Sequence, residues 1–234
     1  MVAGTLWRYR YDRFGFTTRS SQLHESRLLS IGGPLFHYAL LFVAGGHVMG
    51  LLVPEWLTQR LRASETMYHT VALTMGGTAG LAAVCGLAIL LWRRLRVPAV
   101  RRATSRSDRL VHPLLTTVLL AGLAATASSV ANPYDYRLGV AVWFRSLFAL
   151  DPDVPAMAHA PFVYQVHALP AMTLFALWPF SRLVHAFTVP VGYLVRPYIV
   201  YRSRARATPY RHPASTVSDG KRPAAGQQQR ARQR

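Results

Sequence analysis

The sequence contains a single cysteine, Cys85, and only nine acidic residues against 27 Lys and Arg in 234 positions. One cysteine excludes a disulfide within the chain, covalent haem attachment through C-x-x-C-H and a cysteine-held iron-sulfur cluster. Any redox cofactor must therefore use other ligands, and histidine is the obvious candidate. The shortage of acidic residues leaves a formal net charge of +18, although 51% of the residues are hydrophobic. These two values fit together only if basic and apolar residues are segregated along the chain.

Four apolar runs dominate the sequence, and each is long enough to cross a hydrocarbon core of about 30 Å as a helix. They are residues 35–53, 68–92, 110–130 and 162–187. The sequence therefore predicts an all-α membrane protein with four transmembrane helices in an antiparallel bundle. The predicted transmembrane domain covers residues 32–200, between an N-terminal segment (1–31) and a C-terminal tail (201–234). The tail is basic and rich in Pro and Gln with little to bury, so we expect disorder there.

The basic residues lie in alternate loops between the apolar runs. Residues 93–109 hold seven Arg and one Asp, whereas the loops after the first and third runs are nearly neutral or slightly acidic. By the positive-inside tendency, the N-terminus, the 93–109 loop and the tail face the cytoplasm, as in a multi-pass protein of the cytoplasmic (inner) membrane. A nucleic-acid binder would gather its basic residues on one folded surface. We therefore expect the lipid bilayer as a partner and no nucleic acid.

Four histidines lie within the first and last apolar runs: His37, His47, His167 and His185. In a regular helix, the 18 residues from His167 to His185 make close to five whole turns, so both rings would project from one face about 27 Å apart. His37 and His47 would lie about 15 Å apart along their helix. Because these two helices run in opposite directions, His37 pairs with His185 near the cytoplasm, and His47 with His167 further out. The axial separations differ by about 12 Å, which kinks at the prolines of the last run could absorb.

Two histidine pairs stacked across a bilayer suit two non-covalent b-type haems held between helices. A neutral imidazole nitrogen ligates the iron, and the other ring nitrogen usually needs an acceptor nearby. The alternative is that each histidine hydrogen-bonds to a carbonyl or hydroxyl of a neighbouring helix. Small residues near the pairs could give a flat macrocycle clearance or serve ordinary helix packing. They are Gly45, Gly46, Gly50, Gly76, Gly77 and Gly80.

Four longer stretches carry information beyond hydropathy. They are RYRYDRFGFTTRSSQL (8–23), PLFHYALLFVAGGHVMGLLVPEW (34–56), MGGTAGLAAVCGLAILLWRRL (75–95) and VHALPAMTLFALWPFSRLVHAFTVPVGYLVRPY (166–198). Together they resemble the gamma subunit of respiratory nitrate reductase, a membrane diheme cytochrome b. The resemblance covers roughly residues 4–203, and its most specific parts are the two histidine pairs and PFSRLVHAFTVPVGYL.

The resemblance implies a quinol-oxidising subunit of an electron-transfer chain. In this family, quinol (menaquinol or ubiquinol) is oxidised near the outer haem, and electrons pass to the inner haem. They then reach the iron-sulfur centres of a cytoplasmic beta subunit and the molybdenum cofactor of an alpha subunit, where nitrate becomes nitrite. By position, His47 and His167 would ligate the outer haem iron, and His37 and His185 the inner one. Arg182, one turn before His185, could pair with a haem propionate or extend to the membrane interface.

The sequence departs from the family pattern in two places. The family has five transmembrane helices, whereas MVAGTLWRYRYD (1–12) begins where the last turn of the first helix would end. A misplaced start, a fusion partner and a four-helix form are the open explanations. Family members can also carry a lysine implicated in quinol binding, where this chain has Tyr68 and His69. Our hypothesis is that His69, beside Tyr68, accepts the quinol proton, with an interfacial histidine next to an anchoring tyrosine as the alternative.

Two other functions stay open at the level of sequence. The same diheme cytochrome could serve another quinone-linked oxidoreductase, such as a formate dehydrogenase, a hydrogenase or a sulfur-metabolism complex. A haem-free membrane scaffold with structural histidines is the third interpretation. The remaining interior and flanking histidines are expected to be solvated or locally capped and have no assigned role: His24, His112, His159 and His212.

Overall fold

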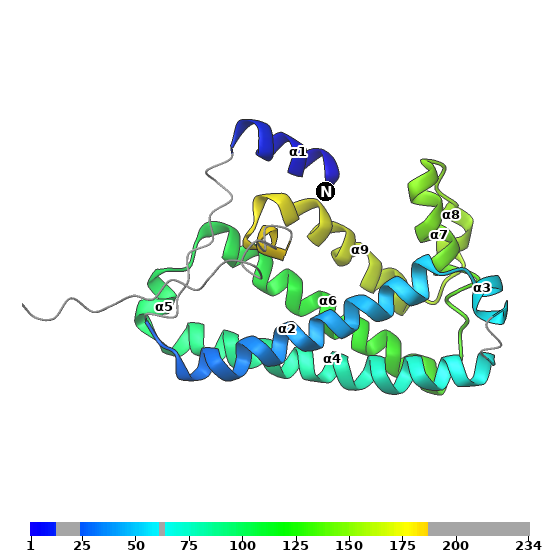
Figure 1. Cartoon of the computed structure of the whole chain (residues 1–234), viewed down its shortest axis with the longest axis horizontal. Helices are drawn as coiled ribbons and strands as arrows, with labels where there is room; N and C mark the ends of the chain where they lie inside the picture. The colour runs from blue at the N-terminus through cyan, green and yellow to red at the C-terminus, as the bar shows by residue number, and fades with distance from the viewer. Residues whose placement is uncertain (13–23, 61–63, 187–234) are drawn as a thin grey trace, which may run out of the picture. The chain divides into compact units, whose positions relative to one another are not determined.

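The computed structural model describes residues 1–12, 24–60 and 64–186, and within these ranges every regular element is a helix (Figure 1). The α-helices are α1 (Val2–Tyr11), α2 (Arg27–His47), α3 (Glu55–Arg60), α4 (Glu65–Arg96), α5 (Pro98–Arg102), α6 (Arg106–Ala131), α7 (Val140–Ser146), α8 (Val154–Ala158) and α9 (Phe162–Leu177). The shorter elements are the π-helix η2 (Val48–Leu52) and the 3₁₀ helices η3 (Leu147–Ala149), η4 (Trp178–Phe180) and η5 (Arg182–Ala186). The predicted tail (201–234) and the end of the predicted transmembrane domain lie outside the described residues.

Three helical segments are long and apolar enough to span a membrane. They are Arg27–Leu52, Glu65–Arg96 and Arg106–Ala131. A shorter apolar segment covers Val140–Ala149. The prediction of an all-α membrane protein is therefore confirmed, and the first three predicted spans coincide with the three long segments.

The fourth predicted span differs from a single regular helix. α9 ends at Leu177 after 16 residues, and the chain continues through η4 and η5, with Ser181 in an extended conformation between them. Pro179 explains the break, because proline has no N–H to donate and its ring clashes with the carbonyl four residues earlier in a helix. His167 therefore lies on α9 and His185 on η5, rather than on one face of a continuous helix.

Helices α2, α4, α6 and α9 form the packed part of the described chain. α2 lies against α4, α4 against α6 and α6 against α9, and successive helices run antiparallel (Figure 1). Gly86 lets α2 and α4 approach closely, since a Cβ at this position would lie 2.6 Å from the backbone nitrogen of Phe36. Buried apolar side chains from all four helices fill the centre: Phe36, Ala39, Ala83, Leu87, Val111, Leu115, Leu119 and Leu174.

Candidate functional site

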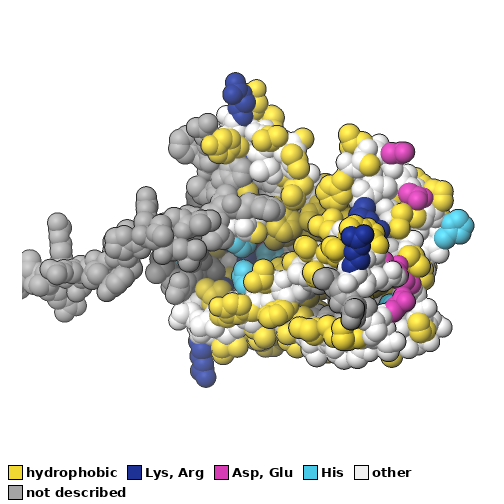
Figure 2. Space-filling model, turned by 45° about the vertical axis from the view of Figure 1, so that its right-hand side comes forward, with side chains coloured by type: hydrophobic (Ala, Val, Ile, Leu, Met, Phe, Trp, Pro, Cys, Tyr) yellow, Lys and Arg dark blue, Asp and Glu magenta, His cyan; other side chains and the backbone are white. Residues whose placement is uncertain are grey.

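The structure brings the four histidines of the first and last apolar runs together in two pairs. The ring of His37 on α2 lies 5.9 Å, centroid to centroid, from the ring of His185 on η5. The rings of His47, at the end of α2, and His167, on α9, are 6.0 Å apart. These are the pairs that opposite helix directions predict, and the break at Pro179 supplies the axial adjustment that a regular helix lacks. Figure 2 shows histidine side chains in a recess bordered by hydrophobic side chains.

Besides its ring partner, each of the four histidines has a hydrogen bond in which Nδ1 donates to a backbone carbonyl. The acceptors for His37, His47, His167 and His185 are, in that order, the carbonyls of Gly33 (2.7 Å), Val43 (2.8 Å), Val118 (3.0 Å) and Arg182 (2.5 Å). Because a carbonyl can only accept, these bonds place the proton of a neutral ring on Nδ1. The lone pair is then on Nε2.

The spacing of each pair fits a bis-histidine metal centre. With a metal–nitrogen bond of about 2 Å on each side and roughly 1.1 Å from Nε2 to the ring centre, the two centroids would be about 6 Å apart. The observed 5.9 and 6.0 Å agree with this value. A metal-ligating histidine also usually donates its other N–H to a carbonyl or carboxylate, which fixes the tautomer. The donor set therefore suits haem iron, for which histidine is a common axial ligand.

Two observations describe how loosely the surroundings of the pairs are packed within the described residues. Among the described helices, α2 and α9 lack the extensive packing that joins α2 to α4 and α6 to α9. In addition, Gly45, Gly46 and Gly76 have no described atom beyond their own helix within 4 Å of the position that a Cβ would take. Gly50 and Gly80 instead serve packing, since a Cβ at either would lie less than 3 Å from a neighbouring side chain. Gly45, Gly46 and Gly76 are exposed, so packing within the described residues does not explain them, and their role in clearance for a macrocycle stays a prediction.

Gly122 on α6 is a site residue that the sequence analysis missed. A Cβ at this position would lie 3.0 Å from Cε1 of His167, so the imidazole ring rests directly on the α6 backbone. The same ring donates to the carbonyl of Val118, one turn earlier on α6. The only signal in the sequence is the lone glycine of the third apolar run, which does not reveal what faces it.

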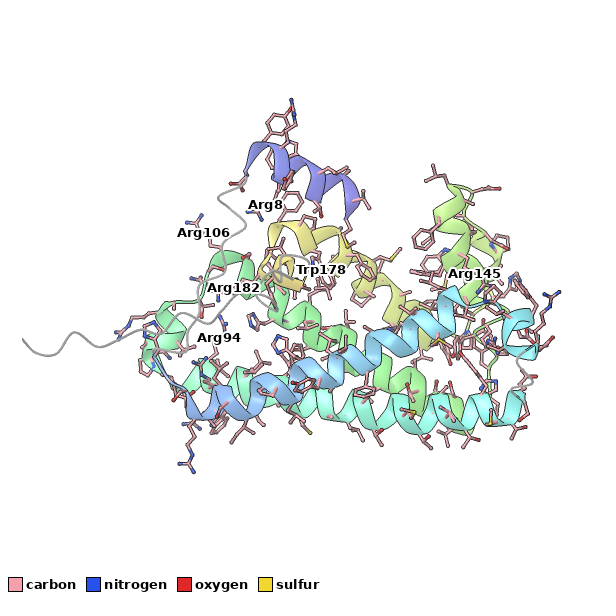
Figure 3. All side chains as sticks on the ribbon, in the orientation of Figure 1. Arg8, Arg94, Arg106, Arg145, Trp178 and Arg182 are labelled. Atoms are coloured by element: carbon pink, nitrogen blue, oxygen red, sulfur yellow. The ribbon has the colours of Figure 1, made fainter. Side chains whose placement is uncertain are left out.

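At the inner pair, Arg182 is bound to a buried carboxylate. Its Nε lies 2.9 Å from Oδ1 of Asp108, whose side chain is 2% exposed. Arg94 of α4 also reaches this carboxylate, with Nη1 3.4 Å from Oδ2 (Figure 3). The sequence analysis did not single out Asp108, because its partners come from distant segments. The contact of Arg182 with a haem propionate stays a prediction, and one edge of the guanidinium already binds Asp108.

Tyr68 and His69, the predicted quinol-site residues, lie at the start of α4. The Tyr68 hydroxyl is 3.4 Å from that of Tyr136, and burial raises the pKa of Tyr136 above its ordinary value, so that this phenol stays protonated. His69 Nε2 is 3.9 Å from Oε1 of Glu65. One ligand atom from each of Glu65, His69 and Asp135 lies within 4.8 Å of the others. The carboxylates of Glu65 and Asp135 therefore lie close to His69, the predicted proton acceptor.

Tyr136 also connects this cluster to the outer histidine pair. Gly50 lies on η2, three residues after His47, and a Cβ at Gly50 would be 2.8 Å from the Tyr136 hydroxyl. Arg145 holds the same turn by donating to the carbonyl of Leu51 (3.0 Å; Figure 3). π-Helical turns such as η2 often occur at functional sites. A chain of contacts therefore joins the predicted quinol-site residues to the segment that follows His47.

These features define a class of protein: an all-helical, multi-pass membrane protein with two cross-helix histidine pairs whose geometry suits bound cofactors. Comparison with known proteins then identifies the family. Residues 1–204 match the family model described as nitrate reductase gamma subunit. The chain belongs to the nitrate reductase gamma subunit family, which confirms the resemblance that its sequence motifs predict.

Several relatives support the same assignment. The nitrate reductase gamma chain of Bacillus subtilis is 44% identical over 205 residues, which cover 87% of this chain and 92% of the relative. The respiratory nitrate reductase 1 gamma chain of Escherichia coli is 32% identical over 205 residues, with coverage of 87% and 91%. The nitrate reductase-like protein NarX of Mycobacterium tuberculosis is 49% identical over 207 residues, which cover 87% of this chain. This chain spans only 32% of the length of NarX.

Proposed function

We propose that this chain is the haem b subunit of a membrane-bound respiratory nitrate reductase. In this role it oxidises quinol near the outer face and passes electrons through two bis-histidine haems. The receiving module is cytoplasmic and consists of an iron-sulfur beta subunit and a molybdenum alpha subunit that reduces nitrate to nitrite. The observation that carries the proposal is the geometry of the two histidine pairs, with centroids 5.9 and 6.0 Å apart and every Nδ1 bonded to a carbonyl.

The ligands divide between the two ends of the bundle. His37 and His185 hold the inner haem iron and His47 and His167 hold the outer one, in each case through Nε2. The carbonyls that accept from Nδ1 keep each ring in the ligating tautomer and orientation. Phe36 packs edge-on against the His37 ring, with centroids 5.4 Å apart, and limits its rotation. Haem supplies one-electron chemistry when bound, and its potential depends on ligands, burial and nearby hydrogen bonds.

At the outer face, His69 accepts a proton from a quinol hydroxyl. Oxidation of a quinol to a quinone releases two electrons and two protons, so a base within hydrogen-bond reach lowers the barrier to electron loss. Glu65 and Asp135 lie beside His69 and stabilise the positive charge that the imidazole then carries. The Tyr68 hydroxyl, close to that of Tyr136, is placed one residue earlier and can hydrogen-bond a quinol oxygen.

The orientation in the inner membrane follows from charge. The Arg-rich segment 93–109, which joins α4 to α6, faces the cytoplasm under the positive-inside tendency, and His69 then faces the opposite side. The N-terminus and the tail share the cytoplasmic side. The relatives from Bacillus subtilis and Escherichia coli are nitrate reductase gamma chains, which favours nitrate over formate, hydrogen or sulfur compounds as the chemistry of the partner module.

A haem count with single histidine replacements tests the proposal. The complex is purified, and a reduced-minus-oxidised spectrum and a pyridine haemochrome assay are recorded for the wild type and for Ala variants at the four paired histidines. His159→Ala is the matched control, because His159 is exposed and its Nδ1 also lies against a carbonyl, that of Pro155 (2.7 Å).

We expect two haems per chain. The His37→Ala and His185→Ala variants lose the same haem, the His47→Ala and His167→Ala variants lose the other, and His159→Ala retains both. Losses that group in any other way contradict the ligand assignment. A wild-type complex without haem contradicts the proposed function and favours the haem-free scaffold.

A further inference from the structure

Asp108 joins three segments at the end of the bundle that carries His185. It lies in the first turn of α6, and its side chain is 2% exposed. Oδ2 accepts from the backbone N–H of Ser105 (2.9 Å), as part of a capping box, and lies 3.4 Å from Nη1 of Arg94 on α4. Oδ1 lies 2.9 Å from Nε of Arg182, the first residue of η5. A single carboxylate therefore ties α4, α6 and η5 together.

Arg182 in turn orients the ring of His185. The carbonyl of Arg182 accepts the hydrogen bond from His185 Nδ1 within η5. η5 is five residues long and follows the break at Pro179, and such short 3₁₀ segments have poor hydrogen-bond geometry of their own. The position of η5 therefore depends on tertiary contacts. The Arg182 side chain supplies them through Asp108 and through a longer bond of 3.4 Å to the carbonyl of Ala103.

Burial makes the carboxylate difficult to replace. A buried charge is tolerated only with a partner of opposite charge and with hydrogen bonds to its oxygens. Asp108 has both, from two arginines and from its place at the N-terminus of α6, where negative charge is favoured. In return, its charge offsets those of Arg94 and Arg182, which would otherwise repel each other.

We infer that Asp108 is a positioning residue for the inner haem and that it acts through Arg182 on the ring of His185. The inference rests on the proposed function, since the group in question is the haem that His37 and His185 would hold. Asp108 fixes η5, and its negative charge balances the arginines beside this ligand. Removal of that charge leaves surplus positive charge near the haem, which favours the reduced form.

The test uses potentiometric titration and low-spin EPR spectra of both haems in the purified complex. Asp108→Asn keeps the shape of the side chain and removes its charge, whereas Asp108→Glu keeps the charge. Asp153→Asn is the matched control, because Asp153 also caps a helix, accepting from the N–H of Ala156 at the start of α8 (3.0 Å). Arg182→Gln removes the other end of the same link.

We expect Asp108→Asn to shift the midpoint potential of the inner haem to more positive values and to move its EPR signal. Asp108→Glu gives a smaller shift, and Asp153→Asn gives none. The outer haem keeps its wild-type potential and signal in every variant. In an Arg182→Gln background, Asp108→Asn causes no further change in the EPR signal, because the orienting link is already lost.

Wild-type signals of the inner haem in Asp108→Asn, or equal changes at both haems, would overturn the inference. Full additivity of Asp108→Asn and Arg182→Gln in the EPR signal would also refute the route through Arg182. If the Asp108→Asn complex does not assemble, the Arg182→Gln variant tests the inference instead. An unchanged inner-haem signal in Arg182→Gln then refutes it. A wild-type complex that lacks haem instead refutes the proposed function.

Discussion

The Cε1 edge of the His167 ring lies against Gly122 on the neighbouring helix α6. Two atoms define this relationship: Nδ1 donates to the carbonyl of Val118 at 3.0 Å, and Cε1 would be 3.0 Å from a Cβ at position 122. The ring is therefore located by the backbone of a helix that contributes no histidine to either pair. This arrangement makes α6 part of the outer site.

Gly122→Ala is expected to weaken retention of the outer haem while leaving the inner haem in place. The added methyl group displaces the His167 ring from its hydrogen bond, and loss of such supporting contacts lowers metal affinity by roughly tenfold or more. The haemochrome count and the separate optical signals of the two haems measure the effect. Gly77→Ala is the control, since the nearest atom to a Cβ there, Cγ2 of Thr126, is 4.0 Å away. An equal response of both variants would contradict the role of Gly122.

Gly86→Ala should affect both haems in parallel. A Cβ at this position would lie 2.6 Å from the backbone nitrogen of Phe36, which cannot rotate away, so α2 must move from α4. Because α2 carries His37 and His47, its displacement changes the geometry of both pairs together. Overpacking of this kind typically costs about 1–3 kcal/mol of stability. Thermal denaturation and haem content measure the outcome, and selective loss of one haem would count against a shift of the whole helix.

His69→Ala is expected to slow quinol oxidation on the order of a hundredfold, because a positioned general base contributes about that much. Both haems should remain bound and reducible by dithionite, since His69 is not a ligand in the proposal. Stopped-flow measurement of haem reduction by quinol, compared with reduction by dithionite, separates slow quinol oxidation from loss of haem. His159→Ala in the exposed outer loop serves as the control. Undiminished reduction by quinol in His69→Ala would remove this residue from the mechanism.

Tyr136→Phe should reduce the loss of stability at alkaline pH. Burial, with a further contribution from the hydrogen bond to Tyr68, raises the pKa of the Tyr136 phenol above its ordinary value of about 10. The stability that depends on the protonated phenol is therefore fully present below about pH 10 and is lost as the pH rises toward the folded pKa.

Thermal unfolding of wild type and Tyr136→Phe between about pH 8 and 11 measures this difference. The two curves should run parallel below about pH 9, and the wild type should decline more steeply above about pH 10. Tyr11→Phe is the control, because Tyr11 is 70% exposed. Equal declines in all three proteins would show that burial of Tyr136 has no such effect.

Hydropathy and chain direction were sufficient to predict the three long spans and which histidines approach each other. Apolar runs mark the three long spans, and the opposite directions of the first and last runs place His37 with His185 and His47 with His167. These features depend on order and period along the chain, which a sequence displays directly. Whether the paired rings bind haem stays a prediction.

The supporting contacts could not be predicted in the same way, because they depend on how separate helices meet. Asp108 lies in the segment 93–109 together with seven arginines, yet its shortest ion pair is with Arg182, beyond the break that follows α9. The sequence shows Pro179 as a site for a kink or a break, but it does not show whether the helix continues beyond the proline. The sequence shows a glycine at position 122, but it does not show that the His167 ring packs against it.

One member of each histidine pair belongs to the same continuous helix, α2, while the opposite members lie on either side of the break at Pro179. The separation of His37 and His47, and with it the length of the proposed electron path, is therefore set by the helical repeat of α2. Insertion or deletion of one residue between His37 and His47 would change this length by only about 1.5 Å but would turn one ring by about 100° relative to the other. The number of residues between His37 and His47 is therefore constrained, whatever the identities of those residues.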